Sequence, residues 1–75
     1  MIESLVLIQG KNVKEQDLWI SLQNALQLVK GNVPGFGVIL HIAADSPDYL
    51  RNALIQFADV PHVTGVVTLM IRSSK

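Results

Sequence analysis

The chain offers few side chains that could do chemistry, and their spacing assembles no catalytic set. His41 and His62 are the only histidines in 75 residues, cysteine is absent, and neither an HxxH nor an HExxH spacing occurs. With no thiolates, and no carboxylate cluster beside either histidine, an ordinary metal site is not expected. The few hydroxyls form no GxSxG motif and no Ser/His/Asp set that spacing supports. We therefore predict a protein that is not an enzyme and that uses no metal or cofactor.

A glycine-rich segment is the best candidate for contact with a ligand. Gly31, Gly35 and Gly37 fall within seven residues, and Phe36 separates the last two. Glycine lets backbone amides approach a ligand, because no Cβ blocks them. The segment lacks the GxxxxGK[ST] pattern of a phosphate-binding loop. The alternative interpretation is that the glycines shape a hairpin and that Phe36 belongs to the core.

These residues define a predicted ligand-binding site for a small molecule. Gly35 and Gly37 would expose backbone amides, and Phe36 would form an apolar wall. Thr68 would add a hydroxyl, and Asp45 would be the countercharge to an amine. The site is expected between subunits, where the glycine-rich loop of one copy meets a strand of another.

Three segments, at residues 2–8, 36–44 and 65–71, have the apolar runs of buried strands. Between the second and third strands, Ser46 is the expected N-cap of a helix and Pro47 its first residue. The expected apolar face of that helix consists of Leu50, Ala53, Leu54 and Phe57.

The segment that follows the first strand is ambiguous. From Val13 the apolar residues take a helical spacing that continues to Val29. In one interpretation the helix runs to Val29, with Asn12 as its N-cap. In the other it ends near Asn24, and Leu26 to Val33 contains a short, poorly patterned strand.

Large aliphatic residues on both faces of the strands indicate association between copies. A sheet with one wet face should alternate apolar and polar residues, whereas these strands do not. An uncovered apolar face of this size marks an interaction surface. The residues predicted for the interface are Leu5, Leu7, Ile39, His41, Val67, Leu69 and Ile71. A parallel sheet with a helix on each face would need no partner.

Composition and charge narrow the class of protein further. The length of 75 residues corresponds to a single small domain (residues 1–75). Of these residues, 49% are hydrophobic, which indicates a folded chain. The formal net charge is zero and the basic residues are scattered, so direct binding of nucleic acid is not expected. There is no apolar run long enough to span a membrane and no recognisable signal peptide, so the expected compartment is the cytoplasm.

The second half of the chain resembles a known family. Phe36 to Asp45 is a strand opened by an aromatic residue and glycine, and Val60-Pro61-His62-Val63-Thr64-Gly65 leads into an aliphatic strand. These segments resemble the effector-binding (RAM) domain of the Lrp/AsnC regulator family, and the resemblance covers most of the chain. It implies an α+β, ferredoxin-like βαββαβ sandwich with two helices on one face of an open sheet. A three-stranded βαβαβ arrangement is the alternative.

The resemblance also implies a function. Domains of this family associate through their sheets and bind small effectors between subunits. We therefore expect a homo-oligomeric, non-catalytic module that binds an amino acid or a related metabolite. The chain also resembles the NapD family of maturation chaperones, at the opening Ser4-Leu5-Val6-Leu7 and at the segment from Val60. That resemblance implies binding of a signal peptide instead. A small dimeric enzyme of ferredoxin-like fold is a further alternative, and His41 would be its main polar group.

Overall fold

A four-stranded sheet and one α-helix make up the computed structural model, which describes residues 1–73. The elements in chain order are β1 (Ile2–Gln9), the 3-10 helix η1 (Glu15–Leu18), β2 (Ala25–Val33), β3 (Gly37–Ala44), α1 (Pro47–Ala58) and β4 (Gly65–Ser73). The strand order is β2-β3-β1-β4, and each neighbouring pair is antiparallel. The expected α+β class and the four-strand interpretation are confirmed.

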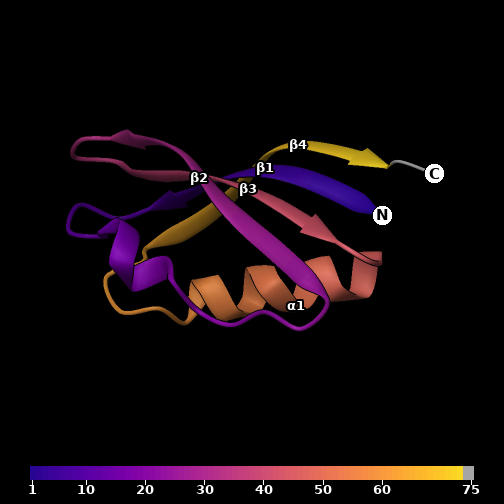
Figure 1. Ribbon diagram of the computed structural model, residues 1–75. Coiled ribbons are helices and arrows are strands. Elements are labelled where there is room, and N and C mark those ends of the chain that lie inside the picture. Colours follow the sequence, from indigo (N-terminus) through magenta and orange to yellow (C-terminus); the bar gives the residue numbers. More distant parts are fainter. Residues whose placement is uncertain (74–75) are drawn as a thin grey trace.

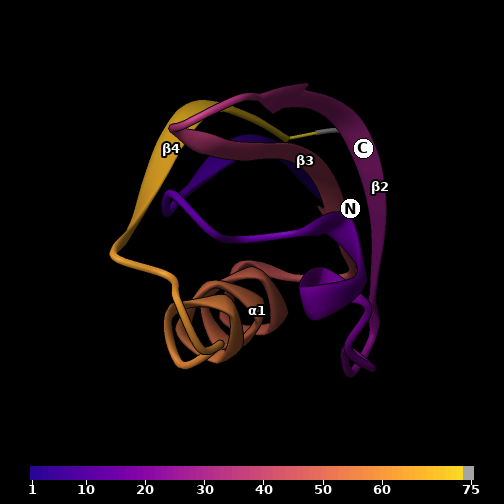
Figure 2. The same ribbon diagram turned by 90° about the vertical axis from the view of Figure 1, so that its left-hand side faces the viewer.

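The elements form two layers, with α1 against one face of the sheet and no other element of residues 1–73 over the opposite face (Figure 1). Viewed at right angles, the sheet curves over α1, and η1 lies on the same side (Figure 2). The hydrophobic core lies between these layers. Its buried members are Val6, Ile8, Val13, Leu18, Val38, Leu40, Ile42, Ala44, Leu50, Ala53 and Phe57.

Helix α1 begins and packs as its sequence predicts. The Ser46 side chain accepts a hydrogen bond from the backbone N–H of Tyr49 at 3.4 Å, and Pro47 occupies the first turn. The side chains of Leu50 and Phe57 are buried against the sheet. No helix within residues 1–73 is both long and apolar enough to cross a membrane.

The predicted first helix is wrong, in both its longer and its shorter version. Only the single turn η1 forms there, and its first residues are tied by a hydrogen bond from the Lys14 backbone N–H to Asp17 Oδ2 at 3.0 Å. Asn12, expected as the cap, precedes this turn. The chain from Ala25 onwards pairs with β3, which satisfies its backbone groups in the sheet. The described fold therefore has one α-helix where two were expected.

A bulge in β4 breaks the alternation predicted for that strand. Thr68 lies opposite Val6 while Met70 lies opposite Leu5, so Leu69 is the extra residue. Beyond the bulge the two faces exchange. Met70 therefore takes the side that Ile71 would occupy in a regular strand.

Candidate functional site

The main candidate site is the sheet face opposite α1, which we call the open face. It is apolar across all four strands. Its larger aliphatic and thioether side chains are Leu5, Leu7, Leu26, Leu28, Ile39, Val67 and Met70. The most exposed of them belong to β2, where Leu26 is 76% and Leu28 is 58% exposed. No described side chain from another layer covers this face, so it is a surface at which the chain can bury apolar area.

Most residues predicted for the interface lie on the open face. Leu7 is opposite Ile39 on one side and Val67 on the other, and Leu5 is opposite His41. Their identification rested on the strict alternation of side chains along a strand, which holds in β1 and β3.

Two predicted interface residues depart from this pattern because of the bulge. Leu69 is the bulged residue, and Ile71 lies opposite Ser4, which faces α1. The prediction that Ile71 shares a face with Val67 is therefore wrong. Met70 was missed for the same reason. Leu26 and Leu28 were not predicted for the interface, because the strand expected within Leu26 to Val33 is poorly patterned and its two faces cannot be assigned from the sequence.

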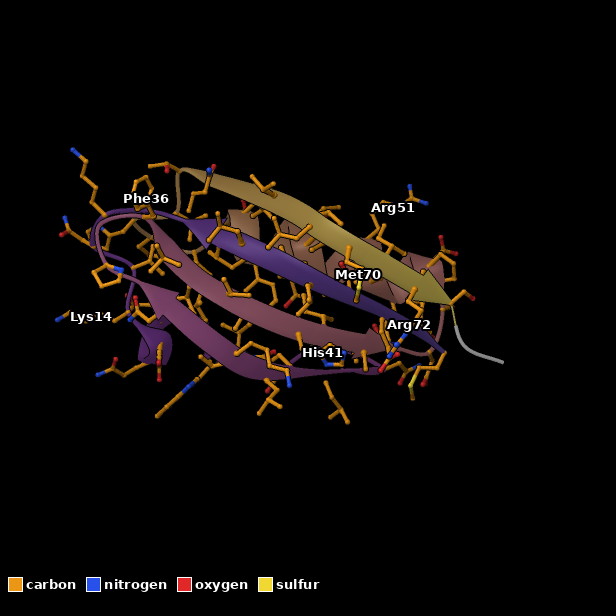
Figure 3. All side chains as sticks on the ribbon, turned by 90° about the horizontal axis from the view of Figure 1, so that it is seen from above. Lys14, Phe36, His41, Arg51, Met70 and Arg72 are labelled. Carbon is orange, nitrogen blue, oxygen red and sulfur yellow. The ribbon has the colours of Figure 1, made fainter. Side chains whose placement is uncertain are left out.

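A small group of charged and polar side chains closes one end of the open face. Glu3 Oε2 accepts hydrogen bonds from Arg72 at 2.7 and 3.2 Å, and Glu3 Oε1 lies 3.4 Å from His41 Nε2. Figure 3 shows His41 and Arg72 on neighbouring parts of the face, which is seen from above. The hydrogen bond from Arg72 lowers the pKa of Glu3, against a smaller opposing effect of desolvation, so the carboxylate stays ionised. Glu3 therefore contacts both His41 and Arg72, which makes this end of the open face polar.

A second candidate site lies at the end of the sheet where three loops meet. A hollow of about 540 Å³ there is lined by residues 9–12, by Gly35 and Phe36, and by His62 and Thr64. We call it the loop-end hollow. Figure 3 shows Phe36 at this end of the sheet, with His41 and Arg72 toward the other. The hollow has the size of a small-molecule site.

Backbone hydrogen bonds fix the three loops around Gln9 and Gly10. The N–H of Gly10 donates to the carbonyl of Phe36 at 2.7 Å, and the N–H of Thr64 donates to that of Gln9 at 2.8 Å. Gly10 is required here, because a Cβ on it would lie 2.3 Å from the carbonyl oxygen of His62. The floor of the hollow is therefore built from tightly packed backbone.

The structure brings only part of the predicted ligand site together. Gly35 and Phe36 line the loop-end hollow, but Asp45 follows the far end of β3 and lines a different hollow. Thr68 lies within β4, opposite Val6. Within one chain, Asp45 and Thr68 therefore cannot meet a ligand held at Phe36. A site between two copies stays a prediction.

Gly37 has a structural role that the sequence did not reveal. It is buried with a φ of 153°, and a Cβ on it would lie 1.9 Å from the carbonyl oxygen of Ile8. Such a contact is far inside van der Waals distance. Gly37 therefore allows the close pairing of β3 with β1, and its replacement by valine would disrupt the fold.

The hollow also contains residues that were not predicted as ligand contacts, chiefly Lys11 and His62. They are far apart in the sequence and carry no recognisable motif. The available signal was topological: in this strand order the end of β1, the β2–β3 hairpin and the start of β4 share one end of the sheet.

Comparison with protein families, characterised proteins and solved structures found no match to this chain. The resemblances described above therefore rest on the quoted residues alone.

Proposed function

We propose that this chain is a non-catalytic module that pairs with a second copy through its open face and binds a small metabolite, such as an amino acid or a related compound. The observation that carries the proposal is the open face itself. The same strands that bury Val6 and Leu40 against α1 present Leu7 and Ile39, with no covering layer among the described residues, on the other side. Burial of that second apolar surface would stabilise a small domain whose own core is limited.

The size of the open face suits a second copy of the chain. Four strands about 4.8 Å apart and about eight residues long span roughly 500 Å² of flat area. Because side chains project from this plane, the accessible area is larger than the flat area and approaches the roughly 800 Å² that each partner contributes to a standard interface. Two open faces packed together would form a sandwich of sheets about 10 Å apart.

The charge distribution also suits self-association. The chain has no formal net charge, and the charged groups at the end of the open face already pair with one another. A second copy would therefore meet an apolar centre without leaving an unpaired charge buried, which is the costly case.

A ferredoxin-like origin is part of this proposal. The antiparallel order β2-β3-β1-β4 is the order of a βαββαβ sheet, and α1 occupies the place of the second helix. We infer that the first helix is reduced to η1. Val13 and Leu18 then pack against the sheet where that helix would lie.

Peptide binding, the function of the chaperone resemblance, is a second candidate supported by β4. This strand is at the edge of the sheet, and its residues from Val67 to Ser73 are exposed. An extended peptide could add to that edge by backbone hydrogen bonds. Titration with a twin-arginine signal peptide tests this candidate, and chemical-shift changes confined to β4 would support it.

The proposed association is tested by the mass in solution. Light scattering at micromolar concentration should give at least twice the monomer mass of 8.2 kDa. Leu28→Lys should reduce the mass to that of the monomer, because a charge in the interface loses its hydration. The matched control is Ile55→Lys on α1, since Ile55 is 54% exposed and Leu28 58%. A monomeric wild type, or equal dissociation by both variants, would falsify the proposal.

A further inference from the structure

We propose that the loop-end hollow binds a small organic carboxylate that carries a planar group and no charged amine. This inference rests on the proposed function and narrows its class of metabolite: it excludes free amino acids, which carry a charged amine, and leaves related carboxylates. Three observations support it: the charge of the hollow, the backbone of His62 and the position of Phe36.

The hollow carries positive charge without a neutralising acid. Lys11 is among its lining residues, and none of the lining residues is Asp or Glu. Within residues 1–73 the ion pairs are Glu3 with His41 and Arg72, and Asp48 with Arg51, so Lys11 has none. A ligand carboxylate would supply the missing partner through a charge-assisted hydrogen bond. A ligand ammonium would find no counterion here, because Asp45 lies at the other end of β3.

The backbone of His62 is held in a conformation that side chains rarely adopt. Its φ is 74°, in the left-handed region that glycine occupies without strain. Backbone hydrogen bonds hold the two residues that follow it, from Val63 N–H to the carbonyl of Val60 at 3.2 Å and from Thr64 N–H to that of Gln9 at 2.8 Å. Strain of this kind is concentrated at binding sites. His62 lines the hollow, and its imidazole can donate a hydrogen bond.

Phe36 supplies the apolar part of the site. Its side chain is 67% exposed at the tip of the β2–β3 hairpin, and it lines the hollow. Its carbonyl is bound by Gly10, so the hairpin is anchored although the ring is free. An exposed aromatic ring beside a cation suits a planar ligand that bears an anionic group.

Benzoate is a suitable probe, because it has both a ring and a carboxylate. In a titration followed by amide chemical shifts, benzoate should bind saturably and shift the signals of residues 10–12, Phe36 and His62. Benzamide removes the charge and should bind at least tenfold more weakly than benzoate. Phenylglycine is phenylacetate with an added ammonium group, and it should bind at least tenfold more weakly than phenylacetate. Non-saturable shifts with benzoate, or equal affinity for benzamide, would overturn the inference.

Two variants test the assigned residues. Lys11→Met keeps the aliphatic stem, and His62→Asn keeps a residue type that tolerates positive φ. Each should weaken benzoate binding at least tenfold without lowering the melting temperature. Lys14→Met is the matched control, since Lys14 is exposed but does not line the hollow, and it should bind like the wild type. Unchanged affinity in Lys11→Met would contradict the role of that cation.

The mass of the same samples separates this inference from the proposed function. A dimer that fails to bind benzoate would overturn the ligand class and leave the association intact. A monomer that binds benzoate with the expected selectivity would support the site and overturn association through the open face.

Discussion

The two faces of the sheet have similar side chains but different surroundings. On the α1 side, Val6, Ile8 and Leu40 are completely buried, whereas Leu5 and Leu7 on the open face are only partly covered. The same strands supply both sets, so the difference comes from the neighbouring layer and not from the strands. A chain with a single α-helix can cover one face. We propose that a second copy of the chain covers the open face.

The largest expected effect comes from placing a charge on each face in turn. Leu40→Lys should abolish folding, because an ammonium group would be buried without a partner at a site with no solvent exposure. Val67→Lys should keep the fold and chiefly reduce association, because Val67 is 39% exposed on the open face. Circular dichroism and thermal unfolding of both variants check this contrast. A folded Leu40→Lys protein would contradict the assignment of the two faces.

A smaller but still large difference is expected between two glycines of the same hairpin. Gly37→Ala should lower the free energy of unfolding by about 3 kcal/mol or more, from backbone strain and overpacking together. The cause is the Cβ position 1.9 Å from the carbonyl oxygen of Ile8. Gly31→Ala should have a much smaller effect, since nothing lies within 4 Å of the corresponding position. Urea unfolding measures both. Equal destabilisation would show that β1 and β3 are not so closely paired.

The smallest effect concerns the charged end of the open face. The hydrogen bond from Arg72 lowers the pKa of Glu3 below its ordinary value of 4.5. The folded state therefore binds this proton less readily than the unfolded state, so the stabilisation is present above that value and is lost as the pH falls below it. The difference in unfolding free energy between the wild type and Glu3→Gln should shrink from about pH 6 to about pH 3. A difference that does not change with pH would argue against the ion pair.

Three strands and α1 could be predicted from the sequence because their local signals agree. The strand at β3 is bounded by glycine and an aromatic residue, and Ser46 and Pro47 mark the start of α1. The helix predicted from Val13 is wrong because a strand with apolar residues on both of its faces can also match a helical spacing. Pairing with β3, which is a tertiary interaction, decides the outcome there.

The candidate site was predictable only in part. Alternation identified the open-face residues of β1 and β3, but a bulge cannot be located from one sequence, so Ile71 was placed on the wrong face. Gly35 and Phe36 were found from composition. Lys11 and His62 join them only through the meeting of three loops, and no spacing along the chain reports that.

The most direct test asks whether the open face is covered in solution. The chain has no cysteine, so a single thiol can be introduced on either side of the molecule. Leu28→Cys lies on the open face and Ile55→Cys on α1, at parent positions that are 58% and 54% exposed in one chain. A thiol reagent should react with Leu28→Cys more slowly as protein concentration rises, whereas its rate with Ile55→Cys should stay constant. Equal, concentration-independent rates at both positions would contradict association through the open face.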